Sequence, residues 1–400
     1  MQKVYKAIIV GGGASGLVSA IELASNKNKI DGKDILVLEK LDRVAKKLIA
    51  TGNGQANLSN ANLSVSNYYG DTKFISDFFD GAKNISVKDF FMSLGLPFYT
   101  MKDGRQYPLS RQANAVVDIL RYKIQSLDIE VKTNYEVTDI AFNDGLFTLS
   151  TANGKFFAKK VILAVGGKAG KQYGTDGSAY SLAEKFGHKT TKLYPSLVQV
   201  KTDTKLIKGL KGIKEQAKVY ALDGDKVLKS ADGDLLFTEY GVSGSAVFQV
   251  SGHLNTAVNP VVKIEFLPDY SLAEVEQIIQ TRLDGVTFID KSDLLIGIVN
   301  KKLGQLLMSA VKSLTAKEIA KTLKDFRLSV KETLGFNYAQ VTKGGITTID
   351  VNPKTCESSL KDGLYLTGEY LDVDGDCGGY NLTFAFLSGM VSAIDIKSKI

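Results

Sequence analysis

The sequence contains few of the residues that build disulfides and metal sites: two cysteines and two histidines among 400 residues. Cys356 and Cys377 are too few for a disulfide framework and too far apart for a redox-active C-x-x-C pair. The histidines belong to no H-E-x-x-H or C-x-x-C pattern, which argues against a zinc site. We therefore expect no metal centre.

Long apolar runs are also missing, since none approaches the ~20 residues that cross a bilayer. The first apolar run, Val4 to Val10, leads straight into glycines and lacks the length and the cleavage site of a signal peptide. These absences predict a cytoplasmic protein without a membrane partner. The apolar fraction of 44% is that of a globular protein with a sizeable core.

Basic residues are in excess, with a formal net charge of +7, but the lysines are spread along the chain. Nucleic-acid-binding proteins usually concentrate positive charge on one element or carry a recognisable module. We therefore interpret the lysines as a solvated surface and expect no nucleic-acid partner.

A glycine-rich motif follows the first predicted strand. Residues 6–10 form this strand, the motif Gly11-x-Gly13-x-x-Gly16 comes next, and residues 17–25 are predicted to be helical. Gly11 permits a tight turn, Gly13 lets the backbone approach a pyrophosphate, and Gly16 lets helix and strand pack closely. The phosphates would lie at the helix N-terminus, where free N–H groups point at them.

The second predicted strand, residues 34–38, is followed directly by Glu39. An acid in this place accepts hydrogen bonds from ribose hydroxyls. The glycine motif alone is weak evidence. With both strands, the helix and the acid in order, it predicts a dinucleotide-binding βαβ unit.

A β-meander is predicted after a helix over residues 113–126. Its strands are residues 130–142, 146–150 and 155–158, with Asn-Asp-Gly and Asn-Gly turns between them. Residues 161–165 then form a separate buried strand that ends in Gly166-Gly167.

The late part of the chain distinguishes FAD from NAD. Gly368-Glu369 follows a buried strand, and Gly379-Tyr380-Asn381 precedes a predicted helix. Together with the meander, this is the arrangement of FAD-binding two-dinucleotide folds. There the acid binds the ribityl chain and the helix N-terminus faces the flavin pyrimidine. We predict non-covalent FAD. No second glycine motif is present, which disfavours a dedicated NAD(P)H domain without excluding transient NAD(P)H binding.

The predicted fold class is α/β: a two-dinucleotide-type, Rossmann-like FAD-binding fold with a β-meander and an inserted domain. The FAD-binding domain comprises residues 1–191 and 342–400. Residues 192–341 form the insert, which is β-barrel-like with a helical part over residues 271–325. In the helical part, Ser271 with Glu274 and Thr315 with Glu318 fit the capping box.

Several segments carry a resemblance to a known family. They are KKL at 46–48, TGNGQANLSN at 51–60, GR at 104–105 with YP at 107–108, GTDG at 174–177, LFTEYGVSG at 236–244 and, most specifically, GEYLDVDGDCGGYNL at 368–382. On these segments and the N-terminal motif, nearly the whole chain resembles the bacterial NAD(FAD)-utilising dehydrogenase-like flavoproteins, which include the aminoacetone oxidases. The resemblance implies an FAD-dependent oxidoreductase.

The motifs and this resemblance together give the candidate cofactor-binding residues. They are Gly11, Gly13, Ala14, Ser15, Gly16, Glu39, Lys40, Lys47, Asn53, Gly54, Asn57, Val137, Ala164, Gly166, Gly167, Gly368, Glu369, Asp374, Gly379, Tyr380, Asn381 and Leu382.

The sequence departs from the family pattern at places that bear on the substrate. Gln55 stands where many relatives have Arg, and Glu239 stands where they have His. These changes make the implied pocket less basic, which favours a cationic amine over an anionic substrate. We take Glu239, its neighbour Tyr240 and Gln55 as candidate catalytic residues, and the aminoacetone oxidase subgroup as the nearest match.

Three functions remain open. The first is oxidation of a small amine, with O2 as acceptor and H2O2 as product, at a site between the FAD-binding domain and the insert. The second is NAD(P)H-dependent reduction of an activated C=C bond, as bile-acid-related members of the family suggest. The third is an FAD-holding, RNA-associated or regulatory protein without catalytic activity. The oligomeric state stays open.

Overall fold

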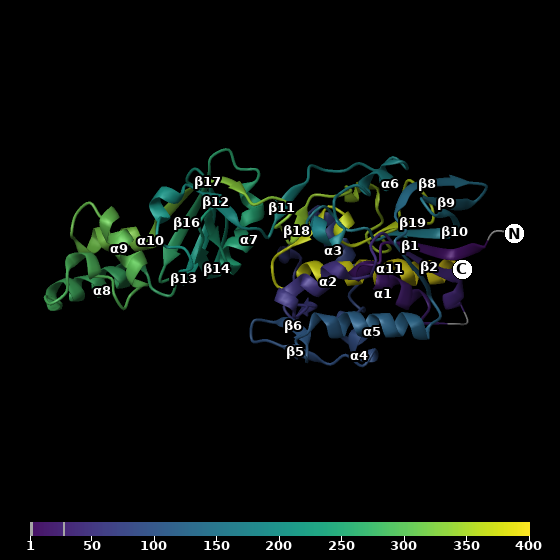
Figure 1. The fold of residues 1–400 in the computed structure, drawn as a ribbon, viewed down its shortest axis with the longest axis horizontal. Helices are drawn as coiled ribbons and strands as arrows, with labels where there is room; N and C mark the ends of the chain where they lie inside the picture. Colours follow the sequence, from purple (N-terminus) through teal and green to yellow (C-terminus); the bar gives the residue numbers. More distant parts are fainter. Residues whose placement is uncertain (1–2, 27–28) are drawn as a thin grey trace. The chain divides into compact units, whose positions relative to one another are not determined.

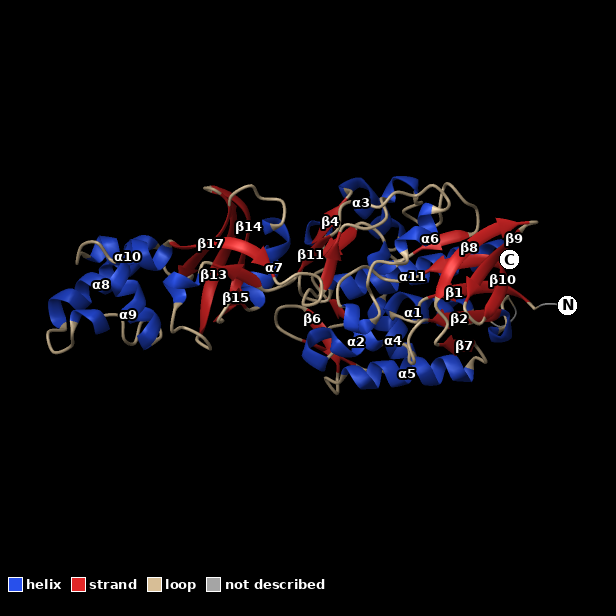
Figure 2. Ribbon diagram, turned by 45° about the horizontal axis from the view of Figure 1, so that its top comes forward, coloured by secondary structure: helices blue, strands red, loops and turns tan. Residues whose placement is uncertain are grey.

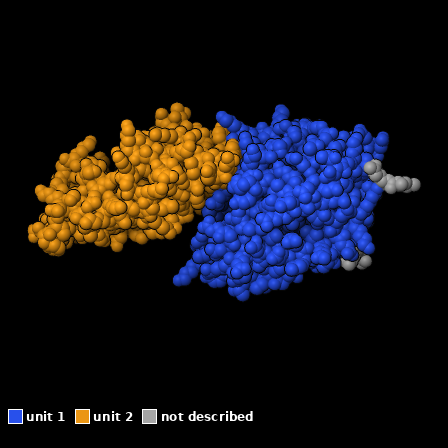
Figure 3. All heavy atoms as spheres, viewed as in Figure 1, with its two compact units in different colours: residues 1–193, 340–400 blue, residues 194–339 orange. Residues whose placement is uncertain are grey.

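The computed structural model describes residues 3–26 and 29–400, and the chain divides into two compact units (Figure 3). Unit 1 comprises residues 1–193 and 340–400, and unit 2 comprises residues 194–339. The insert predicted from the sequence spans residues 192–341.

The core of unit 1 is a twisted sheet whose parallel part has the order β7-β2-β1-β10-β19. Figure 1 labels β1, β2, β10 and β19, and Figure 2 labels β7. Its central strands are short, rich in Val, Ile and Leu, and buried, as expected for parallel strands covered on both faces. The strands are β1 (Val4–Val10), β2 (Ile35–Glu39), β7 (Glu130–Thr133), β10 (Gly154–Leu163) and β19 (Leu364–Leu366).

Strand β10 joins the meander to the parallel sheet. One of its edges pairs with β1 from Phe157 to Leu163. The other edge pairs antiparallel with β9 (Leu146–Thr151) over residues 154–158, then parallel with β19 over residues 161–163. The sequence-based assignment of two separate strands here is therefore wrong, because one extended segment serves both kinds of pairing.

The predicted strand over residues 130–142 is two strands, β7 and β8 (Val137–Asn143). Asn134 has a φ of 62°, which turns the chain out of the parallel sheet. After the turn, the Tyr135 N–H donates to the Glu39 carbonyl oxygen at 2.9 Å. Strand β8 then pairs with β9 to complete the meander.

Helices α1 (Ala14–Leu23) and α11 (Tyr380–Lys399) lie side by side against the sheet (Figures 1 and 2). Gly389 makes this packing close, because a Cβ there would lie 2.6 Å from the Ser15 carbonyl oxygen. Helix α5 (Ala113–Ser126) packs against α1 and α2. The other helices and strands of unit 1 are α2 (Lys46–Ala50), α3 (Thr72–Gly81), α4 (Val87–Ser93), α6 (Tyr180–Glu184), β3 (Ser59–Asn60), β4 (Tyr68–Gly70), β5 (Phe98–Thr100), β6 (Arg105–Pro108), β18 (Val341–Lys343) and β20 (Val373–Gly375). Its short 3-10 helices include η2 (Thr51–Gly54) and η8 (Gly368–Tyr370).

Unit 2 contains a closed antiparallel barrel with the order β12-β15-β14-β13-β16-β17. Alternate residues such as Val219, Ile264 and Leu328 are fully buried inside it, which is the period-two pattern of barrel strands. Its elements are β11 (Tyr194–Ser196), β12 (Val200–Thr202), β13 (Lys214–Asp223), β14 (Lys226–Phe237), β15 (Gly241–Ser243), β16 (Pro260–Phe266), β17 (Phe326–Thr333), α7 (Ser245–Leu254), α8 (Leu272–Gly285), α9 (Lys301–Ala310) and α10 (Ala316–Lys324).

Two helices of unit 2, α8 and α10, begin at the predicted caps. Ser271 and Glu274 form a reciprocal capping box at α8, and the Thr315 side chain accepts from the Glu318 N–H at α10. These observations confirm the α/β class with a barrel and a helical part. Within the described ranges, no helix combines the length and the apolar character needed to span a membrane.

Candidate functional site

The first part of the site is the turn between β1 and α1. A Cβ on Gly11 would lie 2.4 Å from the Ala164 carbonyl oxygen, and one on Gly16 would lie 2.0 Å from the Gly11 carbonyl oxygen. Glycine is therefore required at both positions for the close packing of turn, helix and sheet. Gly13 differs, because a Cβ there would meet nothing within 4 Å.

The N-terminus of α1 is free to bind an anion. Gly13 is the N-cap residue, and within residues 3–26 and 29–400 no side chain caps this end and no acid lies in the first turn. The open space at Gly13 and the free N–H groups of Ala14 and Ser15 suit a pyrophosphate. The Ser15 hydroxyl is buried without a hydrogen-bond partner among the described residues and lies beside Gly368.

Glu39 lies at the end of β2, beside the glycine turn. Its two carboxylate oxygens accept from the N–H groups of Gly12 and Leu41, each at 2.8 Å. Burial raises the pKa of Glu39, while these backbone N–H donors act in the opposite direction. Each oxygen keeps a second lone pair, so the carboxylate can still accept from ribose hydroxyls. Next to it, the Lys40 ammonium pairs with Asp176 at 3.2 Å.

Glu369 forms the second part of the site. Its carboxylate accepts from the Lys47 ammonium at 2.6 Å and from the Thr342 N–H at 2.8 Å. The Thr342 hydroxyl in turn accepts from the Lys168 and Ala169 N–H groups at 2.7 and 2.9 Å, which holds the loop after Gly167 in place. Thr342 could not be found from the sequence, because it reaches this loop from a strand more than 170 residues away.

The N-terminus of α11 is the third part of the site. Gly379, its N-cap residue, has a φ of 98°, and a Cβ there would lie 2.4 Å from the Ser59 carbonyl oxygen. The described residues supply neither a side-chain cap nor an acid in the first turn. The Asn381 amide exchanges hydrogen bonds with the backbone N–H and C=O of Gly375, at 2.8 and 2.7 Å. Asn57 can accept from the Gly379 N–H at 3.0 Å.

The loop after α2 lies against this helix N-terminus. Its residues Gly52, Asn53 and Gly54 have φ values of 57°, 54° and 81°, and Ala56 has a φ of 55°. Asn tolerates left-handed backbone, but the conformation is unfavourable for Ala56, and such strain is typical of functional loops. Gln55, a candidate catalytic residue, lies within this loop and is half-buried.

A cluster from β6 and the segment before α11 was not predicted as catalytic. The Arg105 guanidinium pairs with Asp103 at 2.7 Å and interacts with both Tyr107 and Cys377. Burial raises the pKa of the Tyr107 hydroxyl and of the Cys377 thiol, and the Arg105 charge opposes both shifts. Burial also raises the pKa of Tyr380, so all three groups carry their protons at neutral pH.

Other predicted residues occupy supporting or separate places. Ala164 and Gly166 lie in the loop after β10, Val137 begins β8, and Leu382 lies in the first turn of α11. Glu239 and Tyr240 belong to unit 2, whereas the other predicted site residues belong to unit 1. Glu239 is exposed and pairs with Lys211 at 2.5 Å, and Tyr240 is half-buried.

These observations fit FAD. Helices α1 and α11 both begin at N-termini that no side chain among the described residues caps, and Glu39 ends the second strand. Gly368, the residue before Glu369, lies beside the Ser15 side chain at the start of α1. Four buried polar atoms in this unit lack partners among the residues described: the Ser15 hydroxyl, the Tyr180 hydroxyl, Nδ1 of His188 and Oδ1 of Asp374. Unpartnered buried polar atoms are rare in folded proteins unless a ligand or water satisfies them.

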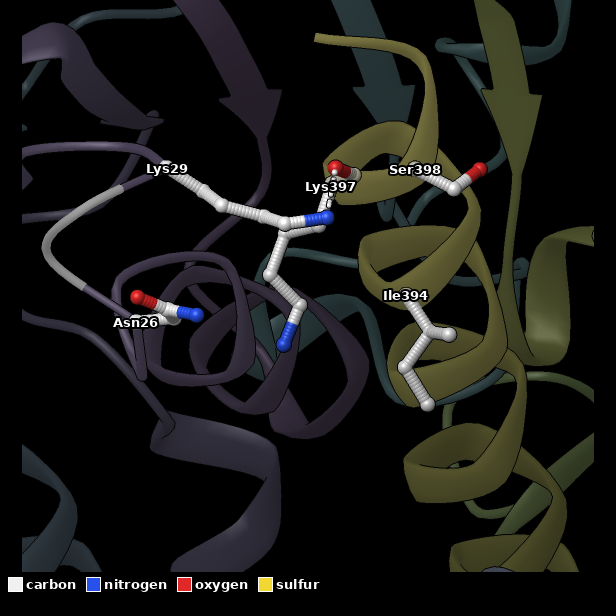
Figure 4. A pocket seen from close by; sticks show the side chains of 5 residues that line it. All are labelled: Asn26, Lys29, Ile394, Lys397 and Ser398. Atoms are coloured by element: carbon white, nitrogen blue, oxygen red, sulfur yellow. Dashed lines mark hydrogen bonds between the residues drawn. The ribbon is translucent and has the colours of Figure 1, made fainter.

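A separate cavity of about 290 Å³ lies at the other ends of the same helices (Figure 4). Asn26 and Lys29 after α1 and Ile394, Lys397 and Ser398 of α11 line it. The Lys29 ammonium crosses it to donate to the Lys397 carbonyl oxygen at 3.2 Å. Its place excludes it as the dinucleotide site. Within the described part of the chain, no group of three or more His, Cys, Asp or Glu side chains could hold a metal ion.

Comparison with known proteins gives the same class. The structure resembles the 3-ketosteroid-delta4-(5alpha)-dehydrogenase from Rhodococcus jostii with a TM-score of 0.53 and 15% identity, over 99% of this chain and 98% of that one. The protein is an FAD-dependent oxidoreductase with a Rossmann-type FAD-binding fold. The model of the HI0933-like protein Rossmann domain matches residues 5–395, and the chain belongs to the HI0933-like family.

Two relatives match nearly the whole chain. The 3-dehydro-bile acid delta(4,6)-reductase of Clostridium scindens is 36% identical, over 96% of this chain and 97% of the relative. The ribosomal RNA dihydrouridine synthase of Haemophilus influenzae is 27% identical, over 99% of this chain and 100% of the relative. These relatives support the family predicted from the sequence. The aminoacetone oxidase subgroup stays a prediction.

Proposed function

We propose that this FAD-dependent oxidoreductase reduces a C=C bond conjugated to a carbonyl group, with NAD(P)H as the reductant. FAD, when bound, supplies the hydride for such a reduction. The chain itself must then stabilise negative charge on the carbonyl oxygen and provide a proton for the carbon next to the carbonyl group.

The cluster of Arg105, Tyr107 and Cys377 is the observation that carries this proposal. An arginine beside buried, protonated hydroxyl and thiol groups suits an oxygen that becomes negative and a carbon that must be protonated. In this proposal Arg105 stabilises the oxyanion, and the hydroxyl of Tyr107 or Tyr380 donates the proton. A neutral amine substrate would need neither group.

The reactions named for the two relatives share this chemistry. A 3-dehydro bile acid with delta(4,6) unsaturation has a C=C bond conjugated to a ketone. Conversion of uridine to dihydrouridine likewise saturates a C=C bond next to a carbonyl group. The class of bond is therefore our proposal, and the two relatives suggest steroid-like and uracil-like substrates.

The structure supports a cationic amine substrate less than the sequence does. The sequence favoured this substrate because Gln55 replaces an Arg and because Glu239, in place of a His, adds a carboxylate. Glu239 is instead exposed and neutralised by Lys211 at 2.5 Å. Negative charge to bind a cationic amine would have to come from elsewhere, so the amine oxidase remains the second hypothesis.

The test uses the purified holoenzyme under anaerobic conditions. NADH or NADPH should bleach the visible flavin band, and a 4-en-3-one steroid or a uridine-containing RNA should restore it without oxygen. Re-oxidation by neither compound, together with bleaching by aminoacetone and peroxide formation in air, would establish the amine oxidase instead.

Arg105 gives a sharper test within the same assay. Arg105→Gln should slow re-oxidation by the C=C substrate by roughly 10²- to 10³-fold, as for loss of one oxyanion donor, and leave bleaching by NADPH unchanged. Arg121→Gln is the matched control, because Arg121 lies exposed on α5 and only pairs loosely with Asp118 at 3.7 Å. Equal rates in both variants would remove Arg105 from the mechanism.

A further inference from the structure

Asp374 is a buried carboxyl group without an evident structural role. It lies in β20, which pairs with β4, and only 4% of the residue is exposed. Its Oδ1 atom has no hydrogen-bond partner in the described part of the chain. Burying a carboxylate in this way is costly unless the group is neutralised. The protein tolerates this cost in the segment that joins Glu369 to the N-terminus of α11.

The charges around Asp374 are mostly negative. Glu369, Asp372 and Asp376 come from the same segment, Lys343 of β18 is the opposing cation, and Tyr69 of β4 contributes a hydroxyl. Burial is the largest influence and raises the pKa of Asp374 to about 7, with the neighbouring carboxylates adding to the rise and Lys343 opposing it. This carboxyl group therefore gains or loses its proton close to neutrality.

The neighbouring carboxylates are satisfied, in contrast to Asp374. Asp376 accepts from the Tyr69 hydroxyl at 2.7 Å and from the Asn67 amide at 3.3 Å. Glu369 accepts from Lys47 and from the Thr342 N–H. Both groups therefore have donors for their carboxylate oxygens, whereas Oδ1 of Asp374 has none among the described residues.

Asp374 is also coupled to the end of the site that would hold the flavin ring. The next residue, Gly375, is held through its N–H and C=O by the Asn381 side chain in the first turn of α11. Negative charge that develops at this helix N-terminus on reduction would act on the nearby carboxyl group and raise its proton affinity.

We propose that Asp374 takes up a proton from solvent when FAD held by unit 1 is reduced. A hydride donor brings two electrons and one proton and adds one negative charge to the site. Conversion of the Asp374 carboxylate to the carboxylic acid then removes that added charge. The proposal rests on FAD binding and not on the identity of the substrate.

The test is a redox titration of the holoenzyme with a chemical reductant, repeated across a pH range centred on about 7. One extra proton per two electrons changes the equilibrium constant tenfold per pH unit, which is about 30 mV per pH unit in midpoint potential. The wild type should show a segment steeper by this amount. Asp374→Asn should lack the steeper segment, and Asp376→Asn, the matched control, should keep it.

Equal slopes in wild type and Asp374→Asn would overturn the proposal, as would loss of the steeper segment only in Asp376→Asn. If the Asp374→Asn variant fails to retain FAD, the proposal is tested instead by infrared difference spectra between the oxidised and the reduced wild type. A new protonated-carboxyl band on reduction supports the proposal, and its absence overturns it. No substrate enters these measurements, so failure of the proposed C=C reduction leaves their outcome untouched.

Discussion

Replacing Gly13 by alanine should weaken FAD binding and leave the apoprotein folded. The added methyl group meets no protein atom within 4 Å, so the apoprotein can accept it without moving its neighbours. The remaining loss, that of glycine at a helix N-cap, is less than about 1 kcal/mol. In the holoprotein the same methyl group occupies the space that a pyrophosphate would need.

The expected loss of FAD affinity follows from overpacking. Forcing one extra carbon into a packed contact costs about 1–3 kcal/mol. This corresponds to an increase in Kd of roughly 5- to 150-fold. Calorimetric titration of the apoprotein with FAD measures the affinity, and a thermal unfolding scan measures the stability of the same sample.

Two controls separate the alternatives. Gly16→Ala should destabilise the apoprotein itself, because its Cβ would lie 2.0 Å from the Gly11 carbonyl oxygen. Gly285→Ala, at the end of α8 with open space around it, should change neither quantity appreciably. If Gly13→Ala bound FAD as tightly as the wild type, the assignment of the pyrophosphate to this helix N-terminus would be refuted.

Three further predictions concern charged groups. Glu239→Gln should change kcat/KM by less than about twofold, because its exposed ion pair is screened by solvent. A tenfold or greater loss of kcat/KM would mean that Glu239 takes part in the functional site. Lys47→Gln should lower the free energy of unfolding by about 1 kcal/mol. Urea unfolding of this variant, of Glu369→Gln and of the double variant should show that the two losses of stability are coupled; additive losses would mean that the 2.6 Å ion pair is not stabilising. The pKa of Asp374 is about 7 in the folded protein, above its ordinary value of 3.8. The free energy of unfolding of the apoprotein, relative to that of Asp374→Asn, should therefore be greatest below pH 3.8 and fall by on the order of 4 kcal/mol as the pH rises to about 7. Urea unfolding of both proteins across this pH range checks the sign.

The sequence was most informative where the site is local. Gly11, Gly13, Gly16 and Glu39 lie within one βαβ unit, whose turn and strand end can be interpreted from neighbouring residues alone. The late acid Glu369 and the glycines before α11 could be identified because they also flank a strand and a helix. The α/β class and the FAD cofactor followed from these segments and are confirmed.

Contacts between distant segments could not be predicted. Thr342 supports Glu369 through its backbone and the loop after Gly167 through its hydroxyl, and a lone threonine gives no pattern for either role. Arg105 and Cys377 meet only because β6 and the segment before α11 come together in the fold. Strand limits failed for the same reason, since the length of β10 depends on partners from three other parts of the chain.

The pairing of β10 with β19 has a consequence for synthesis of the chain. Residues 161–163 can pair with residues 364–366 only after all of unit 2 has been translated. At 5–20 residues per second, the ribosome takes roughly 10–40 s to add the intervening residues. During this time the edge of β10 lacks its partner, and neither Glu369 nor α11 exists. Cofactor loading is therefore a late event, and a nascent chain halted before residue 364 should not retain FAD.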